Sequence, residues 1–147
     1  MGIFDGLMGN ASELKAEDVQ KEIAEIITSN EVVKHAYKVI RDTFIFTNKR
    51  LILVDKQGMT GKKTEYLSIP YKSITNFSIE TAGTFDLDAE LKIWISGNSV
   101  PLQKKFNKAT NIYAVQRVLA ENILSSKTIK RTIMNRSFFV SFIFCVL

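Results

Sequence analysis

The sequence has one cysteine, one histidine and two prolines among its 147 residues. The single cysteine, Cys145, excludes an intramolecular disulfide framework and a metal site built from several thiolates, and it favours a reducing compartment. His35 has no second histidine and no neighbouring cysteine to complete a catalytic or metal-binding set. We therefore expect no enzymatic activity, no catalytic residue, no cofactor and no metal.

A secretory signal and phosphate-binding motifs are also missing. Residues 1–10 contain one acid, Asp5, with no basic residue and no long apolar run, unlike a signal peptide. The patterns GxGxxG and GxxxxGK[ST] do not occur. With 46% hydrophobic and 24% charged residues, the composition is typical of one globular domain, which we expect in the cytoplasm.

Charge is distributed unevenly along the chain. Residues 1–30 contain two basic and six acidic residues, a net charge of −4, whereas residues 101–147 contain eight basic residues and one acid, a net charge of +7. This asymmetry favours head-to-tail contact between subunits or attraction of an anionic partner, and a solvated surface of uneven charge is an equally good interpretation. Nucleic-acid binding is a weaker hypothesis, because the first 30 residues are acidic and the core needs most of the aromatic residues.

The hydrophobic periodicity changes near residue 32. Apolar residues at spacings of three and four predict a helix over Ser12–Ile27, and alternation predicts seven short strands after it. These strands are Val32–Ile40, Thr43–Thr47, Leu51–Asp55, Lys62–Ile69, Tyr71–Thr81, Asp88–Ser96 and Ser99–Gln103. The alternation fails near Thr75 and Asn76, which predicts a β-bulge or a short turn there.

A second amphipathic helix is predicted over about residues 107–124, capped by Asn107 or Thr110. Its apolar face comprises Ile112, Val115, Leu119 and Ile123, flanked by Val118 and Leu124. Many strands followed by one helix predict a mainly β fold, an antiparallel barrel with the helix across one open end. We divide the chain into an N-terminal helical segment (1–30), the barrel with its capping helix (31–124), and a tail (125–147).

The stretch Phe46–Gly97 carries four motifs in order: TNKRL, GxxGKK, SIPYKSI and AGxxDxDxEL. In this combination the chain resembles the bacterial pleckstrin-homology (PH) domain family, over about residues 15–124. The resemblance implies a PH-like barrel of seven antiparallel strands capped by a C-terminal helix. It also implies a tendency to form ring-like homo-oligomers, and no established enzymatic activity.

Three basic pairs lie in or beside predicted turns and are candidate contacts for an anion or a ligand. They are Lys49 and Arg50, Lys62 and Lys63, and Lys104 and Lys105. The alternative is that they keep the barrel soluble and block edge pairing. Eukaryotic relatives of this fold commonly hold phosphoinositides near the loop between the first two strands. Here that connection, residues 40–42, carries only Arg41 beside an acid, so we expect no specific phosphoinositide binding.

The candidate protein contacts are hydrophobic. Trp94 shares a strand face with charged residues, opposite the predicted core face, so it either anchors an interface or is covered by another part of the chain. Ile3, Phe4 and Leu7 lie at helical spacing, and we expect them to contact a neighbouring subunit. These features favour a self-assembling module that binds an unidentified partner.

The tail combines a basic stretch with an apolar one. Residues 125–136 hold four basic side chains and no acid, and nine of the eleven residues of Ser137–Leu147 are apolar. The apolar part is too short to cross a bilayer alone, but it could enter an anionic membrane surface or pair with another chain. We expect it to pack poorly on the barrel. The alternative function is therefore a peripheral membrane adaptor that binds anionic lipid through basic loops and this tail.

Overall fold

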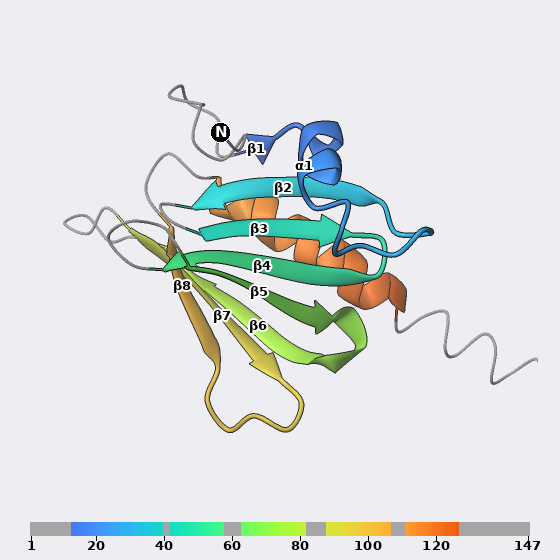
Figure 1. The fold of residues 1–147 in the computed structure, drawn as a ribbon. Coiled ribbons are helices and arrows are strands. Elements are labelled where there is room, and N and C mark those ends of the chain that lie inside the picture. Colours follow the sequence, from blue (N-terminus) through green and yellow to red (C-terminus); the bar gives the residue numbers. More distant parts are fainter. Residues whose placement is uncertain (1–12, 40–41, 58–62, 82–87, 107–110, 127–147) are drawn as a thin grey trace, which may run out of the picture.

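Strands dominate the computed structural model, which describes residues 13–39, 42–57, 63–81, 88–106 and 111–126 (Figure 1). In chain order the elements are β1 (Glu13–Leu14), α1 (Ala16–Glu22), β2 (Val33–Val39), β3 (Asp42–Thr47), β4 (Arg50–Gln57), β5 (Lys63–Pro70), the 3-10 turn η2 (Tyr71–Ser73), β6 (Ile74–Glu80), β7 (Ala89–Ile95) and β8 (Leu102–Phe106). A C-terminal helix follows over residues 112–126. The fold is mainly β with a C-terminal helix, as the sequence predicts.

The strands form two antiparallel sheets rather than the closed barrel of seven strands that the sequence predicts. The first sheet has the order β1-β2-β3-β4-β5, and the second has the order β6-β7-β8. The eighth strand in the described residues is the two-residue β1, which pairs with β2. The sheets stay separate because the chain turns a corner through η2 after Pro70, so β5 and β6 enter different sheets.

Local pairing confirms the clearest strand predictions. β3 and β4 form a hairpin with Phe46 opposite Leu51. Pro70, which has no backbone N–H, is the last residue of the edge strand β5. The register of β6 shifts between Ile74 and Asn76, where the sequence alternation fails.

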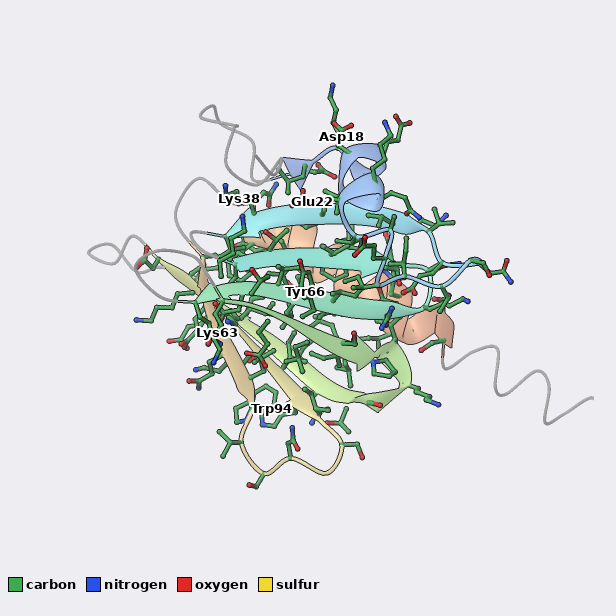
Figure 2. All side chains as sticks on the ribbon, viewed as in Figure 1. Asp18, Glu22, Lys38, Lys63, Tyr66 and Trp94 are labelled. Carbon is green, nitrogen blue, oxygen red and sulfur yellow. The ribbon has the colours of Figure 1, made fainter. Side chains whose placement is uncertain are left out.

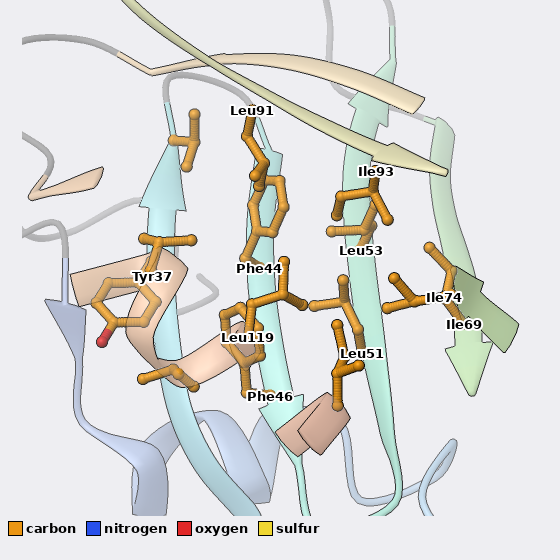
Figure 3. Packing of buried hydrophobic residues seen from close by; sticks show 14 of the residues in the cluster. Tyr37, Phe44, Phe46, Leu51, Leu53, Ile69, Ile74, Leu91, Ile93 and Leu119 are labelled. Carbon is orange, nitrogen blue, oxygen red and sulfur yellow. The ribbon is translucent and has the colours of Figure 1, made fainter. Parts of the chain in front are cut away.

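The first core fills the space between the two sheets and the C-terminal helix. Figure 3 shows alternate residues of β3 and β4 meeting β7 and the helix; they are Phe44, Phe46, Leu51 and Leu53 against Leu91, Ile93 and Leu119. The C-terminal helix therefore covers the apolar side chains that lie between the two sheets.

The C-terminal helix buries the predicted face, with one correction. Ile112, Val115, Val118, Leu119 and Ile123 are all buried, whereas the side chain of Leu124 is 63% exposed. One residue turns a helix by about 100°, so a residue directly after Ile123 points away from the core. Asn111 caps the helix, because its side-chain oxygen accepts a hydrogen bond from the Ala114 N–H at 3.2 Å. The predicted caps, residues 107 and 110, lie outside the described residues.

A second cluster lies on the outer face of the first sheet. Ile45, Ile52 and Val54 alternate with residues of the first core and are covered by the N-terminal segment through Val19 and Ile23. β3 and β4 are therefore buried on both faces. The helix in this segment is shorter than predicted, because α1 ends at Glu22 and turns follow it.

Candidate interaction surfaces

Arg50, a predicted anion contact, is bound by the chain itself. It begins β4, and its Nε and Nη2 donate hydrogen bonds to the Glu31 carboxylate at 2.9 and 3.1 Å. Nη2 also donates to the carbonyl of Ile26 at 2.7 Å, and Nη1 donates to the hydroxyl of Ser68 at 2.8 Å. The guanidinium thus joins the N-terminal segment to β4 and β5, and a role in binding an external anion stays a prediction.

Glu31 completes this polar cluster and is buried, with 2% of its surface exposed. The Thr47 hydroxyl donates to its carboxylate at 2.8 Å, and the backbone N–H of Thr28 donates at 3.1 Å. Burial raises the pKa of Glu31, but the hydrogen bonds from Arg50, Thr28 and Thr47 and the charge of Arg50 together lower it to about 2. We call Glu31, Thr47 and Arg50 the Arg50 cluster; it holds residues 26–31 against the first sheet.

Lys104 forms an ionic connection between the two sheets. Lys104 belongs to β8. Its Nζ lies 2.7 Å from a carboxylate oxygen of Asp42 and 3.7 Å from one of Asp55. Asp42 and Asp55 face each other on β3 and β4, in the other sheet. Burial raises the pKa of Asp42, the hydrogen bond and charge of Lys104 oppose that rise, and the Asp55 carboxylate adds to it. The ammonium therefore stabilises two carboxylates that would otherwise repel each other.

The other basic candidates are separated: Lys49 and Lys63 lie at opposite ends of the first sheet, and Lys105 lies in the second sheet. Lys49 is in the β3–β4 turn, where its Nζ donates to the Thr28 hydroxyl at 3.0 Å. Lys63 begins β5 opposite Gln57, at the far end of β4 (Figure 2). Lys105 is exposed on β8 and opposite Glu90. The structure thus separates Lys49 and Arg50 from Lys63, Lys104 and Lys105. Lys62 lies outside the described residues.

Trp94 lies on the face of the second sheet that points away from the first core. It pairs with Asn76 of β6, and its carbonyl accepts a hydrogen bond from the Thr75 hydroxyl at 3.2 Å. On the same face, the Nζ of Lys92 forms ion pairs with the carboxylates of Glu80 and Glu90, at 3.1 and 3.2 Å. Trp94 is half-buried, and the buried residues of α1 and of the C-terminal helix belong to the two clusters elsewhere, so these two helices are not what covers it (Figure 2).

β5 is exposed along almost its whole length. All eight of its residues pair with β4, and no described strand pairs with its other edge, which we call the β5 edge. Residues 63–68 are all exposed, including 46% of Tyr66 and 38% of Leu67. The sequence predicts this strand but not its exposure, although a proline such as Pro70, which cannot donate to a ladder, is typical of an edge or of the end of a strand.

His35 is the one histidine of the sequence. The Nδ1 atom of His35 lies 3.3 Å from a carboxylate oxygen of Glu13, at the surface. Among the described residues, no group of three or more His, Cys, Asp or Glu side chains could hold a metal. Within the same ranges, no helix has the length and apolar character needed to span a membrane. The predicted contacts Ile3, Phe4 and Leu7 lie outside the described residues.

Comparison with known proteins gives consistent matches. A family model described as bacterial PH domain matches residues 2–123. The uncharacterized protein YjqA of Bacillus subtilis (strain 168) is 61% identical over 121 residues, which are 82% of this chain and 97% of YjqA. The uncharacterized protein YozO of the same organism is 34% identical over 118 residues, which are 80% of this chain and 100% of YozO.

Two solved structures have a similar fold. A DUF1696 family protein with a pleckstrin-homology domain, from Shewanella loihica PV-4, is 54% identical with a TM-score of 0.69, over 78% of this chain and 98% of that one. A pleckstrin homology domain from Shewanella amazonensis SB2B is 52% identical with a TM-score of 0.71, over 83% of this chain and 98% of that one.

Proposed function

Because the chain belongs to the bacterial PH domain family and has a PH-like fold, we propose that it is a non-enzymatic scaffold that assembles into homo-oligomers and binds a further partner. We expect a PH-like domain to act through binding surfaces rather than through catalytic side chains. The basic candidates Arg50 and Lys104 are each paired with carboxylates of the same chain. A surface for binding is therefore a better interpretation than a catalytic site.

The observation that carries the proposal is the β5 edge. A long, regular strand with unpaired backbone groups is a template on which another chain can add a strand. The exposed apolar side chains of Tyr66 and Leu67 lie on opposite faces of this strand and would be covered by such an addition. The acidic residues 1–30 and the basic residues 101–147 favour a head-to-tail arrangement, which closes into a ring when the rotation between subunits permits.

The face of the second sheet that carries the half-buried Trp94 supplies the surface for the further partner. A tryptophan surrounded by charged side chains is typical of a residue that anchors an interface, because the indole can be buried by the partner while the surrounding charges stay hydrated. Its position on the second sheet leaves it accessible when the β5 edge of the first sheet is occupied.

Light scattering after gel filtration of the full chain tests assembly. We expect a discrete multiple of 16.7 kDa for the wild type and a smaller mass for Tyr66→Lys, because a charge at an edge opposes strand pairing. The matched control is Tyr113→Lys, on the C-terminal helix, where the tyrosine is 62% exposed but lies on no strand edge. A wild type that stays at 16.7 kDa at every concentration would refute assembly.

The second candidate function is a peripheral membrane adaptor. It is favoured by the exposure of Lys63 and Lys105 and by the basic and apolar composition of residues 125–147. Binding to anionic vesicles that weakens with salt, and that is absent with neutral vesicles, would support it. Equal indifference to both kinds of vesicle would reject it.

A further inference from the structure

We propose that residues 137–147 add as a strand to the β5 edge of their own chain and thereby control whether that edge is open to a second copy. This inference rests on the proposed function, because it concerns the edge through which we expect the chain to assemble. It also revises the expectation, drawn from the sequence alone, that the tail packs poorly on the folded domain.

The β5 edge leaves one apolar side chain exposed on each face of the strand, Tyr66 and Leu67, among four exposed polar residues. Tyr66 pairs with Val54, a member of the outer cluster, and Leu67 pairs with Leu53, a member of the first core. The first core reaches β5 through Ile69, and the outer cluster ends at Val54 on the neighbouring β4, with Tyr66 and Leu67 left partly in water. A strand that has one polar face would complete only one of the two layers.

The sequence of residues 137–147 places apolar residues on both faces of a strand. Its even-numbered residues are all apolar: Phe138, Val140, Phe142, Phe144 and Val146. Its odd-numbered residues add Phe139, Ile143 and Leu147 to the opposite face. Phenylalanine, valine and isoleucine favour strands, and apolar residues on both faces are typical of a strand buried between two layers.

The position of the C-terminal helix allows the tail to reach its own edge. Residue 126 ends the described part of the helix, at the end of the molecule where η2 joins β5 to β6 (Figure 1). Ile123 of the last turns belongs to the same core as Ile69 of β5. Residues 127–136 span up to about 33 Å when extended, and their four like charges favour extension. The tail can therefore reverse direction and run antiparallel to β5, from Pro70 towards Lys63.

The lone cysteine makes this arrangement testable in the full chain. An antiparallel tail that begins near Pro70 brings Cys145 close to the start of β5, so Thr64→Cys creates a partner for it. Gln103→Cys is the matched control, because Gln103 is equally an exposed residue of an edge strand, β8, in the other sheet. We expect the disulfide with Cys145 to form within one chain, about tenfold faster for Thr64→Cys than for Gln103→Cys, because pairing raises the local concentration of the thiol.

A second variant separates pairing from assembly. Adding Phe142→Asp should reduce disulfide formation in Thr64→Cys to the rate of the control, and Phe142→Asp alone should raise the oligomer mass measured by light scattering. The disulfide rate reports the tail even if the chain proves to be monomeric, so failure of this inference and failure of assembly are distinguishable.

Three results would overturn the inference. One is an equal rate for Thr64→Cys and Gln103→Cys. Another is a Thr64→Cys disulfide that joins two chains instead of closing within one. The third concerns lipid: a polarity-sensitive dye on Cys145 whose emission shifts only with anionic vesicles would place the tail in a membrane surface.

Discussion

Replacing Glu31 with glutamine should destabilise the domain in a pH-dependent way. The carboxylate is buried beside Arg50 and accepts hydrogen bonds from Arg50, Thr47 and the Thr28 backbone. A glutamine keeps the shape of the side chain, but it removes the charge and places an N–H₂ group where an acceptor is required. Arg50 would then be left without its counter-ion.

The magnitude follows from the pKa. Folding lowers the pKa of Glu31 from its ordinary value of 4.5 to about 2. This difference corresponds to about 3 kcal/mol of unfolding free energy, at about 1.4 kcal/mol per pKa unit. Because the folded pKa is the lower one, the contribution is complete above pH 4.5 and is lost as the pH falls towards 2.

Urea unfolding of the full chain at several pH values measures this effect. We expect Glu31→Gln to lose about 2–3 kcal/mol at neutral pH, and the difference from the wild type to shrink as the pH falls below 4.5. Glu17→Gln is the control, since Glu17 is an exposed residue in the first turn of α1. A further variant, Arg50→Met combined with Glu31→Gln, should recover part of the loss because no charge is left buried alone. A difference that is the same at all pH values would refute the reasoning.

Three further predictions concern packing, capping and the link between the sheets. Leu119→Ala should cost about 2–5 kcal/mol in thermal or urea unfolding, whereas Leu124→Ala, at an exposed position, should cost much less; equal costs would contradict the observed helix orientation. Asn111→Ala should cost about 1 kcal/mol, since it removes the cap of the C-terminal helix, and Asn111→Asp should retain that stability. Lys104→Met should cost about 2 kcal/mol at neutral pH, because it leaves the carboxylates of Asp42 and Asp55 close together without the ammonium that pairs with both. Its loss should diminish on acidification, because the pKa of Asp42 is already raised by burial and rises further without the ammonium; a loss that grows on acidification would contradict this assignment.

Features that depend on neighbouring residues could be predicted from the sequence. The hairpin of β3 and β4, the irregularity of β6 and the buried face of the C-terminal helix all follow from periodicities a few residues long. The apolar runs of Phe44–Phe46 and Leu51–Val54 also carried an unused signal. A continuous apolar strand is buried on both faces, and here the second face lies under α1.

The pairing of distant charges could not be predicted. Arg50 and Lys104 lie in basic pairs near predicted turns, and this pattern predicts contacts with an anion. Nothing in those pairs indicates that Glu31 folds against one and Asp42 against the other. The order of the strands in a sheet could not be predicted either. The alternation of residue types in β5 does not indicate whether another strand pairs with its second edge. Contacts of this kind depend on how the chain returns on itself.

The two-sided burial of β3 and β4 has a consequence for synthesis on the ribosome. Every residue of the outer cluster lies between Leu14 and Val54, so all of its residues are available once β4 has emerged. The first core has to wait for Ile123, near the end of the C-terminal helix. During that interval one face of β3 and β4 is covered, and the other face, which carries Phe44 and Leu51, exposes apolar side chains to water. A chaperone that meets the chain at this stage would find its binding site on the side of the hairpin that the mature protein hides.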